Sequence, residues 1–240
     1  MLRRFLLKGK EEMAITFYHP QWAEGRTIQG VLFDLDGLVL DSERLYTRFW
    51  REAAAFYGYD MSLEQALGMR STERENGIRR IKSYFGADAD YVSIRQKRIE
   101  LMDAYLTDHV PEKKPGIFEL LDALRERNIP AAITSSAPLD RIETYLAPHG
   151  LYTRFQAVCS ARQVAKGKPA PDIYLSGAKS LGVDPKNCIA LEDSPTGIEA
   201  AFQAGCLSIL IPDQDDASDS IQDKLYGKAD SLLDIISLLK

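Results

Sequence analysis

Residues 31–42 read VLFDLDGLVLDS. They open with an apolar run, Val31–Phe33, of the kind that forms a strand buried on both faces. The run ends at Asp34 and Asp36, and two carboxylates at i and i+2 point the same way from an extended backbone. Gly37 then lets the chain turn sharply. The sequence therefore predicts a buried strand that carries two like charges at its carboxyl end.

Two adjacent carboxylates are typical of a cation site. Like charges this close raise one pKa or are bridged by a cation. Oxygen-only ligands suit a hard ion such as Mg²⁺. A plain Asp-Gly turn after a strand would contain the same residues, so the rest of the chain has to distinguish the two interpretations.

Composition and charge narrow the possible partners. The chain has 240 residues, of which 45% are hydrophobic and 27% charged, and its net charge is −5. This charge argues against nucleic acid as a partner. No run approaches the ~18 apolar residues of a membrane span, so no membrane partner is expected. The N-terminus lacks the apolar core of a signal peptide, and we expect a cytoplasmic protein.

The cysteines and histidines do not form a recognisable metal or disulfide pattern. Cys159, Cys188 and Cys206 are widely spaced, lack a CxxC pair and lie in or beside apolar runs. We therefore expect buried thiols rather than a disulfide or a zinc site. The three histidines are scattered, which makes a histidine metal site an unfavourable interpretation.

The hydrophobic pattern divides the chain into three parts. Residues 1–27 show no clear pattern, and we expect a partly ordered arm there. Residues 43–112 show helical spacing without a strand signal, which predicts an inserted all-helical cap domain. Residues 28–42 and 113–240 alternate strand and helix patterns, which predicts an α/β core domain.

This alternation specifies the fold class. It predicts a Rossmann-like, doubly wound parallel sheet with helices on both faces. Strands are expected at about 28–34, 129–134, 157–159, 188–191 and 207–211, and a closing helix at 231–239. Ser194 is predicted to cap a helix that has Pro195 in its first turn and ends at Gly205.

Ligands of such sheets bind outside the carboxyl ends of the strands. Several polar and charged residues follow strands at this edge or open a helix beside it, so we expect them to converge in one crevice. They are Asp34, Asp36, Ser135, Ser136, Lys168, Glu192 and Asp193. Several carboxylates with one lysine and a hydroxyl fit Mg²⁺ and a phosphoryl group, because positioning and charge neutralisation are what phosphoryl transfer needs.

Four segments carry a resemblance to a known family. In chain order they are DLDGLVLDSE (34–43), ITSS (133–136), GKPAPDIY (167–174) and LEDSPTGIEAA (191–201). They resemble the four motifs of the haloacid dehalogenase-like hydrolase superfamily, in the branch with a helical cap after the first strand. That branch includes phosphoglycolate phosphatase-like and β-phosphoglucomutase-like proteins. The resemblance covers about residues 28–215.

The resemblance implies a role for each motif residue. Asp34 would attack phosphorus and carry an aspartyl-phosphate, and Asp36 would protonate the leaving alcohol and then activate water. Ser135 and Ser136 would bind the phosphoryl group, and Lys168 would hold it in register with Asp34. Mg²⁺ would be bound by Asp193, the Asp34 side chain and the Asp36 backbone carbonyl. Glu192 would be a further ligand or a support for the ligands.

The substrate is expected to be a small phosphate ester whose identity depends on the cap. Arginines of the cap are candidates for binding a second anionic group, and Arg70, between two helical patterns, is the first of them. The others are Arg44, Arg48, Arg74, Arg79 and Arg80. A monomer is the expected state, with a dimer as the alternative.

Two reactions fit the motifs, and two other classes fit less well. A phosphatase would release phosphate, whereas a β-phosphoglucomutase-like enzyme would return it to a second hydroxyl. Sugar phosphomutases of this family usually have a histidine shortly after the first motif, where this chain has Tyr46. A response-regulator receiver is shorter and lacks a helical insertion. A dehalogenase would not need Asp36 or the magnesium ligands.

Overall fold

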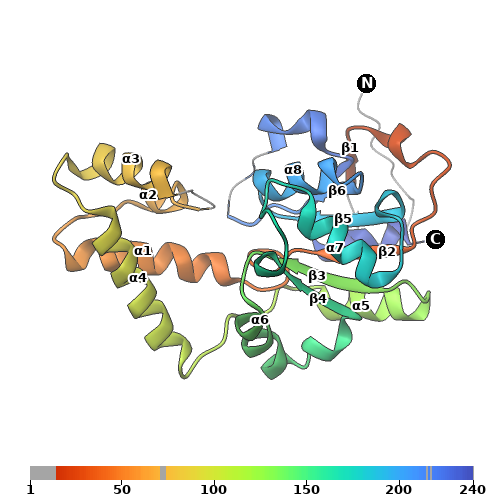
Figure 1. Ribbon diagram of the computed structural model, residues 1–240, viewed down its shortest axis with the longest axis horizontal. Helices are drawn as coiled ribbons and strands as arrows, with labels where there is room; N and C mark the ends of the chain where they lie inside the picture. Colours follow the sequence, from red (N-terminus) through yellow and green to blue (C-terminus); the bar gives the residue numbers. More distant parts are fainter. Residues whose placement is uncertain (1–14, 71–73, 215, 217, 240) are drawn as a thin grey trace. The chain divides into compact units, whose positions relative to one another are not determined.

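A computed structural model describes residues 15–70, 74–214, 216 and 218–239. The chain divides into two compact units, a larger unit of residues 1–40 and 113–240 and a smaller unit of residues 41–112. The elements of each unit are labelled in Figure 1. The predicted insertion, residues 43–112, has nearly the bounds of the smaller unit.

The larger unit is built on a sheet of seven described strands in the order β1-β7-β6-β5-β2-β3-β4. The strands are β1 (Ile15–Phe17), β2 (Gly30–Phe33), β3 (Ala131–Ser135), β4 (Ala157–Ser160), β5 (Cys188–Glu192), β6 (Leu207–Leu210) and β7 (Gly227–Ala229). All neighbours are parallel except β1 and β7, which are antiparallel. The predicted Rossmann-like parallel α/β fold is confirmed.

Strand β2 lies inside the sheet, between β3 and β5. Val31, Leu32 and Phe33 are each 0% exposed, as their apolar run predicts. Leu32 belongs to the core cluster beneath the helices α7 (Asp172–Leu181) and α8 (Pro195–Gln203). The ring of Phe33 meets that of Phe155 edge-on at 5.5 Å. Because both faces of β2 are packed, its carboxyl end is fixed in position.

In the described part of the larger unit, four α-helices accompany this sheet. They are α5 (Ile117–Glu126), α6 (Leu139–Leu146), α7 (Asp172–Leu181) and α8 (Pro195–Gln203). Helix α7 packs on β2, β3 and β4, and α8 packs on β5 and β6. The predicted start of α8 is confirmed, because the Ser194 hydroxyl accepts from the backbone N–H of Gly197 and Pro195 is in the first turn.

Short 3₁₀ helices fill several connections of the larger unit. They are η1 (Pro20–Ala23), η2 (Ala147–His149), η3 (Tyr152–Arg154), η4 (Ala161–Gln163), η5 (Pro185–Asn187), η6 (Ser218–Ser220), η7 (Gln222–Lys224) and η8 (Leu232–Leu238). The predicted closing helix at 231–239 is present as the 3₁₀ helix η8, which packs against α5.

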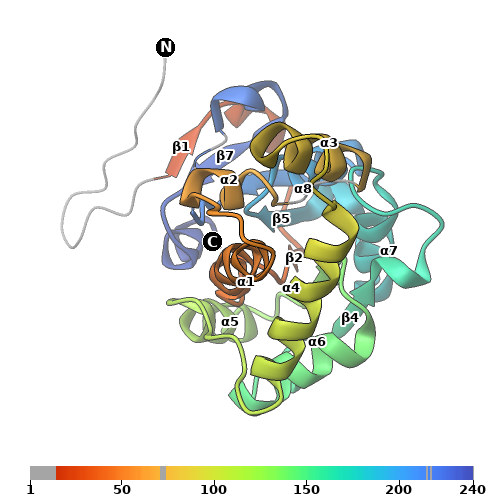
Figure 2. The same ribbon diagram turned by 90° about the vertical axis from the view of Figure 1, so that its left-hand side faces the viewer.

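Part of the segment predicted to be a partly ordered arm, residues 1–27, belongs to the sheet. Residues 1–14 lie outside the described part, but Ile15–Phe17 form β1 and pair with β7, as Figure 2 shows. Both strands have three residues, too short to show an alternating pattern in the sequence. Pairing rather than local pattern therefore defines this edge of the sheet.

The smaller unit consists of helices in its described residues: α1 (Ser42–Phe56), α2 (Leu63–Leu67), α3 (Arg74–Phe85) and α4 (Tyr91–Leu106). Helix α1 packs against α4 and α2, and α3 packs against α4. The unit has its own core, in which the rings of Trp50 and Tyr91 stack at 5.9 Å beside the fully buried Ile81.

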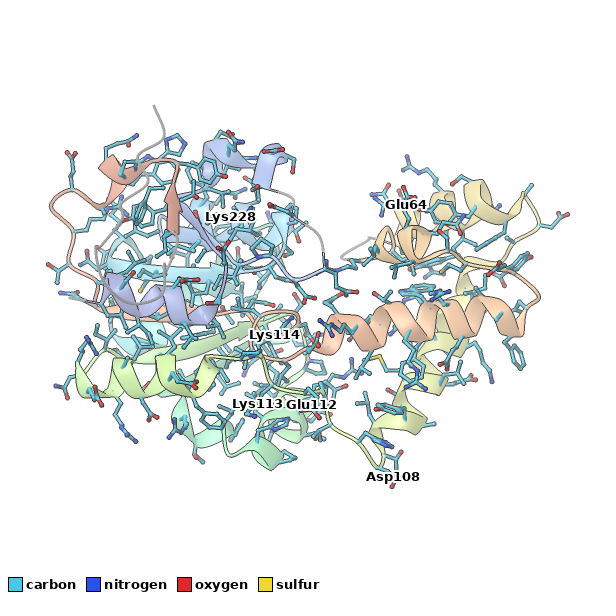
Figure 3. All side chains as sticks on the ribbon, turned by 180° about the vertical axis from the view of Figure 1, so that it is seen from behind. Glu64, Asp108, Glu112, Lys113, Lys114 and Lys228 are labelled. Atoms are coloured by element: carbon cyan, nitrogen blue, oxygen red, sulfur yellow. The ribbon has the colours of Figure 1, made fainter. Side chains whose placement is uncertain are left out.

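Two short segments connect the units, and they run side by side. Leu40 forms an antiparallel bridge with Lys113, and the backbone N–H of Lys114 donates to the carbonyl of Val39 at 2.9 Å. The ammonium group of Lys114 forms an ion pair with Asp213, in the segment after β6. Lys113 and Lys114 are labelled in Figure 3. These contacts attach the returning chain to the larger unit.

Two sequence expectations concern the chain as a whole. All three cysteines are free and buried, so the prediction of buried thiols is confirmed. Within the described ranges, no helix combines the length and the apolar character that a membrane crossing requires.

Candidate active site

The acidic turn after β2 is held by its own backbone and by apolar side chains. The backbone N–H of Asp34 donates to the carbonyl of Leu191 at 3.0 Å, which ties the turn to β5. Gly37 has a φ of 83°, and its N–H donates to the carbonyl of Leu40 at 2.8 Å. Leu35 beside it is fully buried. Asp34 is therefore fixed at the strand end, and only 7% of it is exposed.

Lys168 links this turn to the end of β5. Its Nζ lies 2.5 Å from Oδ1 of Asp34 and 2.5 Å from Oε1 of Glu192, and 7% of its side chain is exposed. The residue comes from the loop that leads into α7. The structure thus brings together three residues that are far apart in the sequence, as the sequence predicted.

The carboxylate of Glu192 accepts hydrogen bonds at both of its oxygens. Its Oε1 accepts from Lys168 and, at 2.6 Å, from the hydroxyl of Tyr174. Its Oε2 accepts from the N–H of Asp193 at 3.2 Å, and from the N–H and hydroxyl of Ser194 at 3.3 and 3.0 Å. A carboxylate has about four lone-pair sites. Because these are engaged by the protein, Glu192 acts as a support for its neighbours.

Helix α8 approaches Glu192 so closely that its third residue has to be glycine. A Cβ built on Gly197 would lie 1.8 Å from Oε1 and 1.9 Å from Cδ of Glu192. The first turn of the helix leaves backbone N–H groups unpaired within the helix, and its dipole favours a negative charge there. Gly197 therefore allows a fully buried carboxylate to lie against the positive end of α8.

The donor set fits a divalent cation. Among the residues that the structure describes, Asp34, Glu192 and Asp193 are all buried and place carboxylate oxygens within 4.8 Å of one another. Lys168 supplies one positive charge to this group of three carboxylates. Buried charges are costly unless they are paired, so the excess negative charge favours a cation with oxygen ligands.

Burial changes the protonation of the group when no cation is present. Desolvation by burial, together with the charges of Glu192 and Asp36, raises the pKa of Asp34 to about 8, against the opposing effect of the Lys168 ammonium. Burial alone would lower the pKa of Lys168, but Asp34 and Glu192 outweigh it and raise that pKa above its ordinary value. Lys168 is therefore a permanent cation, and a bound metal would replace the proton on Asp34.

The two serines predicted at the end of β3 have different surroundings. Ser135 is fully buried, and its Oγ accepts from the N–H of Ala137 at 3.0 Å, whereas Ser136 is exposed. Thr134, before them, donates from its hydroxyl to the carbonyl of Phe33 at 3.1 Å. This bond joins β3 to β2 just below Asp34.

Asp36 lies apart from the buried acidic group. Its backbone bridges to Leu40, and the residue is half-buried. Its charge is close enough to raise the pKa of Asp34, but its carboxylate is not among those within 4.8 Å of one another in the described chain. The side chain thus stands beside the group rather than within it.

Several of the cap arginines form ion pairs within the smaller unit. Nε of Arg70 lies 3.0 Å from Oε2 of Glu43, and 11% of the arginine side chain is exposed. Arg48 and Arg79 are more exposed. Arg48 pairs with Glu52 and Arg79 pairs with Glu75, each one turn away on the same helix. Arg70 is therefore the least exposed of these three arginines.

Sequence reasoning missed two residues of the site. Tyr174 lies in the third motif, but nothing in the local sequence indicates that its hydroxyl meets Glu192. Gly197 lies in the fourth motif, where nothing in the local sequence indicates that a carboxylate packs against it. In both cases the partner is Glu192, which lies on β5, whereas Tyr174 lies on α7 and Gly197 on α8.

The sequence of the chain matches a known protein family. The family model described as "haloacid dehalogenase-like hydrolase" matches residues 28–205. The chain belongs to this family. The predicted resemblance to this family is confirmed.

Named relatives include both phosphatases and a mutase. Hexitol phosphatase B of Escherichia coli is 32% identical over 78% of this chain and 85% of its own length. Beta-phosphoglucomutase of Bacillus subtilis is 30% identical over 76% of this chain and 82% of its own length. A solved hydrolase of the family from Deinococcus radiodurans, with bound phosphate and sodium, is 28% identical, has a TM-score of 0.68, and is matched over 80% of this chain and 86% of that one.

Replacing Gly197 by alanine tests the support of Glu192. Alanine would normally stabilise a helix by roughly 0.5–1 kcal/mol relative to glycine. Here the added methyl group would displace the carboxylate, so we expect the free energy of unfolding to fall by about 1–3 kcal/mol, measured by urea denaturation. Gly167→Ala is the control, because its Cβ would meet only that of Ala161, at 4.0 Å. Equal stability of both variants would contradict the close approach.

Proposed function

We propose that this chain is a Mg²⁺-dependent phosphatase that hydrolyses a small phosphorylated metabolite through an aspartyl-phosphate on Asp34. One observation carries the proposal: Oδ1 of Asp34 is buried at a strand end, 2.5 Å from the Lys168 ammonium, within a group of three buried carboxylates. A carboxylate held in this way is placed for nucleophilic attack and is paired with a cation.

In the first step, a carboxylate oxygen of Asp34 attacks phosphorus and the bond from phosphorus to the ester oxygen breaks. Asp36 donates a proton to the departing alcohol, a role that suits a half-buried acid beside the nucleophile. Lys168 and the polar groups of Ser135 and Ser136 neutralise the charge on the phosphoryl oxygens.

In the second step, water attacks the phosphorus of the aspartyl-phosphate. Asp36, now deprotonated, accepts a proton from the water, and the bond between phosphorus and the Asp34 oxygen breaks. Inorganic phosphate leaves and the Asp34 carboxylate is regenerated. The same acid thus serves both steps, in opposite directions.

The metal ligands we assign are the carboxylates of Asp34 and Asp193 and the backbone carbonyl of Asp36. Glu192 belongs to the acidic group, but its oxygens are already hydrogen-bonded, so we assign it the support of Lys168 and of Asp193. When bound, Mg²⁺ supplies the positive charge that reduces repulsion between an anionic nucleophile and an anionic substrate.

A phosphatase is favoured over a phosphomutase by the surroundings of Tyr46. The mutase relative is 30% identical, so this second reaction has a specific basis. Tyr46 occupies the region where such mutases usually have a histidine, and its ring packs 4.9 Å from the guanidinium of Arg98. A ring stacked in this way has a packing role, and no histidine replaces it in α1.

The substrate class we propose is a sugar or sugar-alcohol phosphate, in line with the named activities of the hexitol phosphatase and the beta-phosphoglucomutase. We further propose that Arg70 binds a polar or anionic group of that substrate, since the Glu43 carboxylate holds its guanidinium in a defined orientation. The smaller unit would then act as a cap that selects the substrate.

Removal of the nucleophile or of the metal is expected to abolish phosphate release. The assay compares wild type with Asp34→Asn, in Mg²⁺ and in chelator, on hexitol phosphates, hexose phosphates, phosphoglycolate and nucleoside monophosphates. Asp103→Asn, on the exposed face of α4, is the matched control and should retain full activity. Release that persists in Asp34→Asn would remove the nucleophile assignment. Conversion of glucose 1-phosphate primed by a bisphosphate, without net release, would favour the mutase.

Arg70→Ala tests the cap residue. Loss of a charged hydrogen bond to the substrate should raise KM by about tenfold or more with little change in kcat. Glu43→Gln removes the negative partner but keeps the arginine, so its KM should change less. Steady-state kinetics on the best ester measures both. Equal KM values in wild type and Arg70→Ala would assign Arg70 to the packing of the smaller unit.

A further inference from the structure

Tyr174 is a fully buried tyrosine on α7, a helix that packs on the central strands. Its neighbours in the core cluster are apolar or small, among them Leu32, Ala132 and Ala178. A phenylalanine would fill such a place equally well. A buried hydroxyl is costly unless it is hydrogen-bonded, so the bond that it makes indicates why a tyrosine is present.

That bond leads directly to the active site. The Tyr174 hydroxyl donates to Oε1 of Glu192 at 2.6 Å, and this is the oxygen that Lys168 contacts at 2.5 Å. The two donors therefore share one acceptor atom. A carboxylate oxygen has two lone pairs. Because the Tyr174 hydroxyl occupies one of them, the other is left to accept from the Lys168 ammonium.

The ring of Tyr174 contacts the other member of the ion pair. Nζ of Lys168 lies 5.1 Å from the centre of the ring, within the range of a cation–π interaction. Tyr174 thus touches both groups: its hydroxyl fixes the Glu192 oxygen, and its ring flanks the ammonium. A lysine has a flexible four-carbon stem and a rotatable head, so it depends on such contacts for a single orientation.

We propose that Tyr174 is a positioning residue, which holds Glu192 through its hydroxyl and thereby keeps the Lys168 ammonium directed at Asp34. Its catalytic consequence rests on the proposed phosphatase function; its geometric part does not. Tyr174 contacts Glu192 through its hydroxyl and is not one of the residues that we assign to the nucleophile or to the metal. Its effect on the reaction acts through the alignment of Lys168 as charge develops on the phosphoryl group.

The test compares wild type, Tyr174→Phe and Tyr226→Phe. Tyr226 is also buried in the larger unit, and its ring packs edge-on against Phe17 at 5.2 Å, so it is a matched control outside the site. Phenylalanine keeps the ring and the packing volume at both positions. Circular dichroism and thermal unfolding check that each variant is folded.

The first readout does not require activity. In metal-free protein labelled with ¹⁵N-lysine, the Lys168 ammonium signal is assigned by its loss in Lys168→Met. An ammonium fixed by two short hydrogen bonds should exchange its protons slowly with water. We expect several-fold faster exchange in folded Tyr174→Phe and no change in Tyr226→Phe. An unchanged Lys168 signal in Tyr174→Phe overturns the proposal, whatever the enzyme assay shows.

The second readout is steady-state kinetics on the best ester. Tyr174→Phe should lose about tenfold in kcat, the effect of one hydrogen bond to a charged group, while KM stays unchanged. Wild-type kcat in this variant overturns the catalytic consequence. If the wild type itself releases no phosphate from any ester, the proposed function fails, and the exchange of the Lys168 ammonium still decides the positioning role.

Discussion

The bridge from Asp34 through Lys168 to Glu192 is the interaction on which the site depends. Each carboxylate lies 2.5 Å from a nearly buried ammonium. Taking these charges out of water is expensive, and removal of the lysine would leave buried carboxylates without a partner. The sheet, the loop before α7 and the start of α8 all serve to make this arrangement possible. The larger unit can therefore be understood as a scaffold for one charged cluster.

The scaffold works through strand register and close packing. Phe33 of β2 is paired with Leu191 of β5, so Asp34 and Glu192 follow from neighbouring strands at the same level. Thr134 fastens β3 to the same point through the carbonyl of Phe33. At the far side, Gly197 lets the positive end of α8 reach the carboxylate. Backbone geometry thus determines the distances, and the side chains supply the charge.

The central strands and the acidic turn could be predicted because their signals are local. The run Val31–Phe33 is apolar and is followed by carboxylates. Because the carboxyl ends of parallel strands share one edge of the sheet, the residues that follow the other strands were expected beside it. The edge strand β1 could not be predicted, since three residues carry no pattern and its order comes from pairing with β7. Tyr174 was missed for a related reason: its hydrogen-bond partner, Glu192, lies on another element.

Acid-quenched turnover measures directly whether Asp34 receives the phosphoryl group. The enzyme is mixed with its best ester and Mg²⁺, quenched within the first turnover, digested and examined by mass spectrometry. We expect one phosphoryl group on the peptide that contains residues 31–42, at Asp34, and its disappearance when the substrate is exhausted. Turnover of the ester with the phosphoryl group on another residue, or with none on this peptide, would contradict the account.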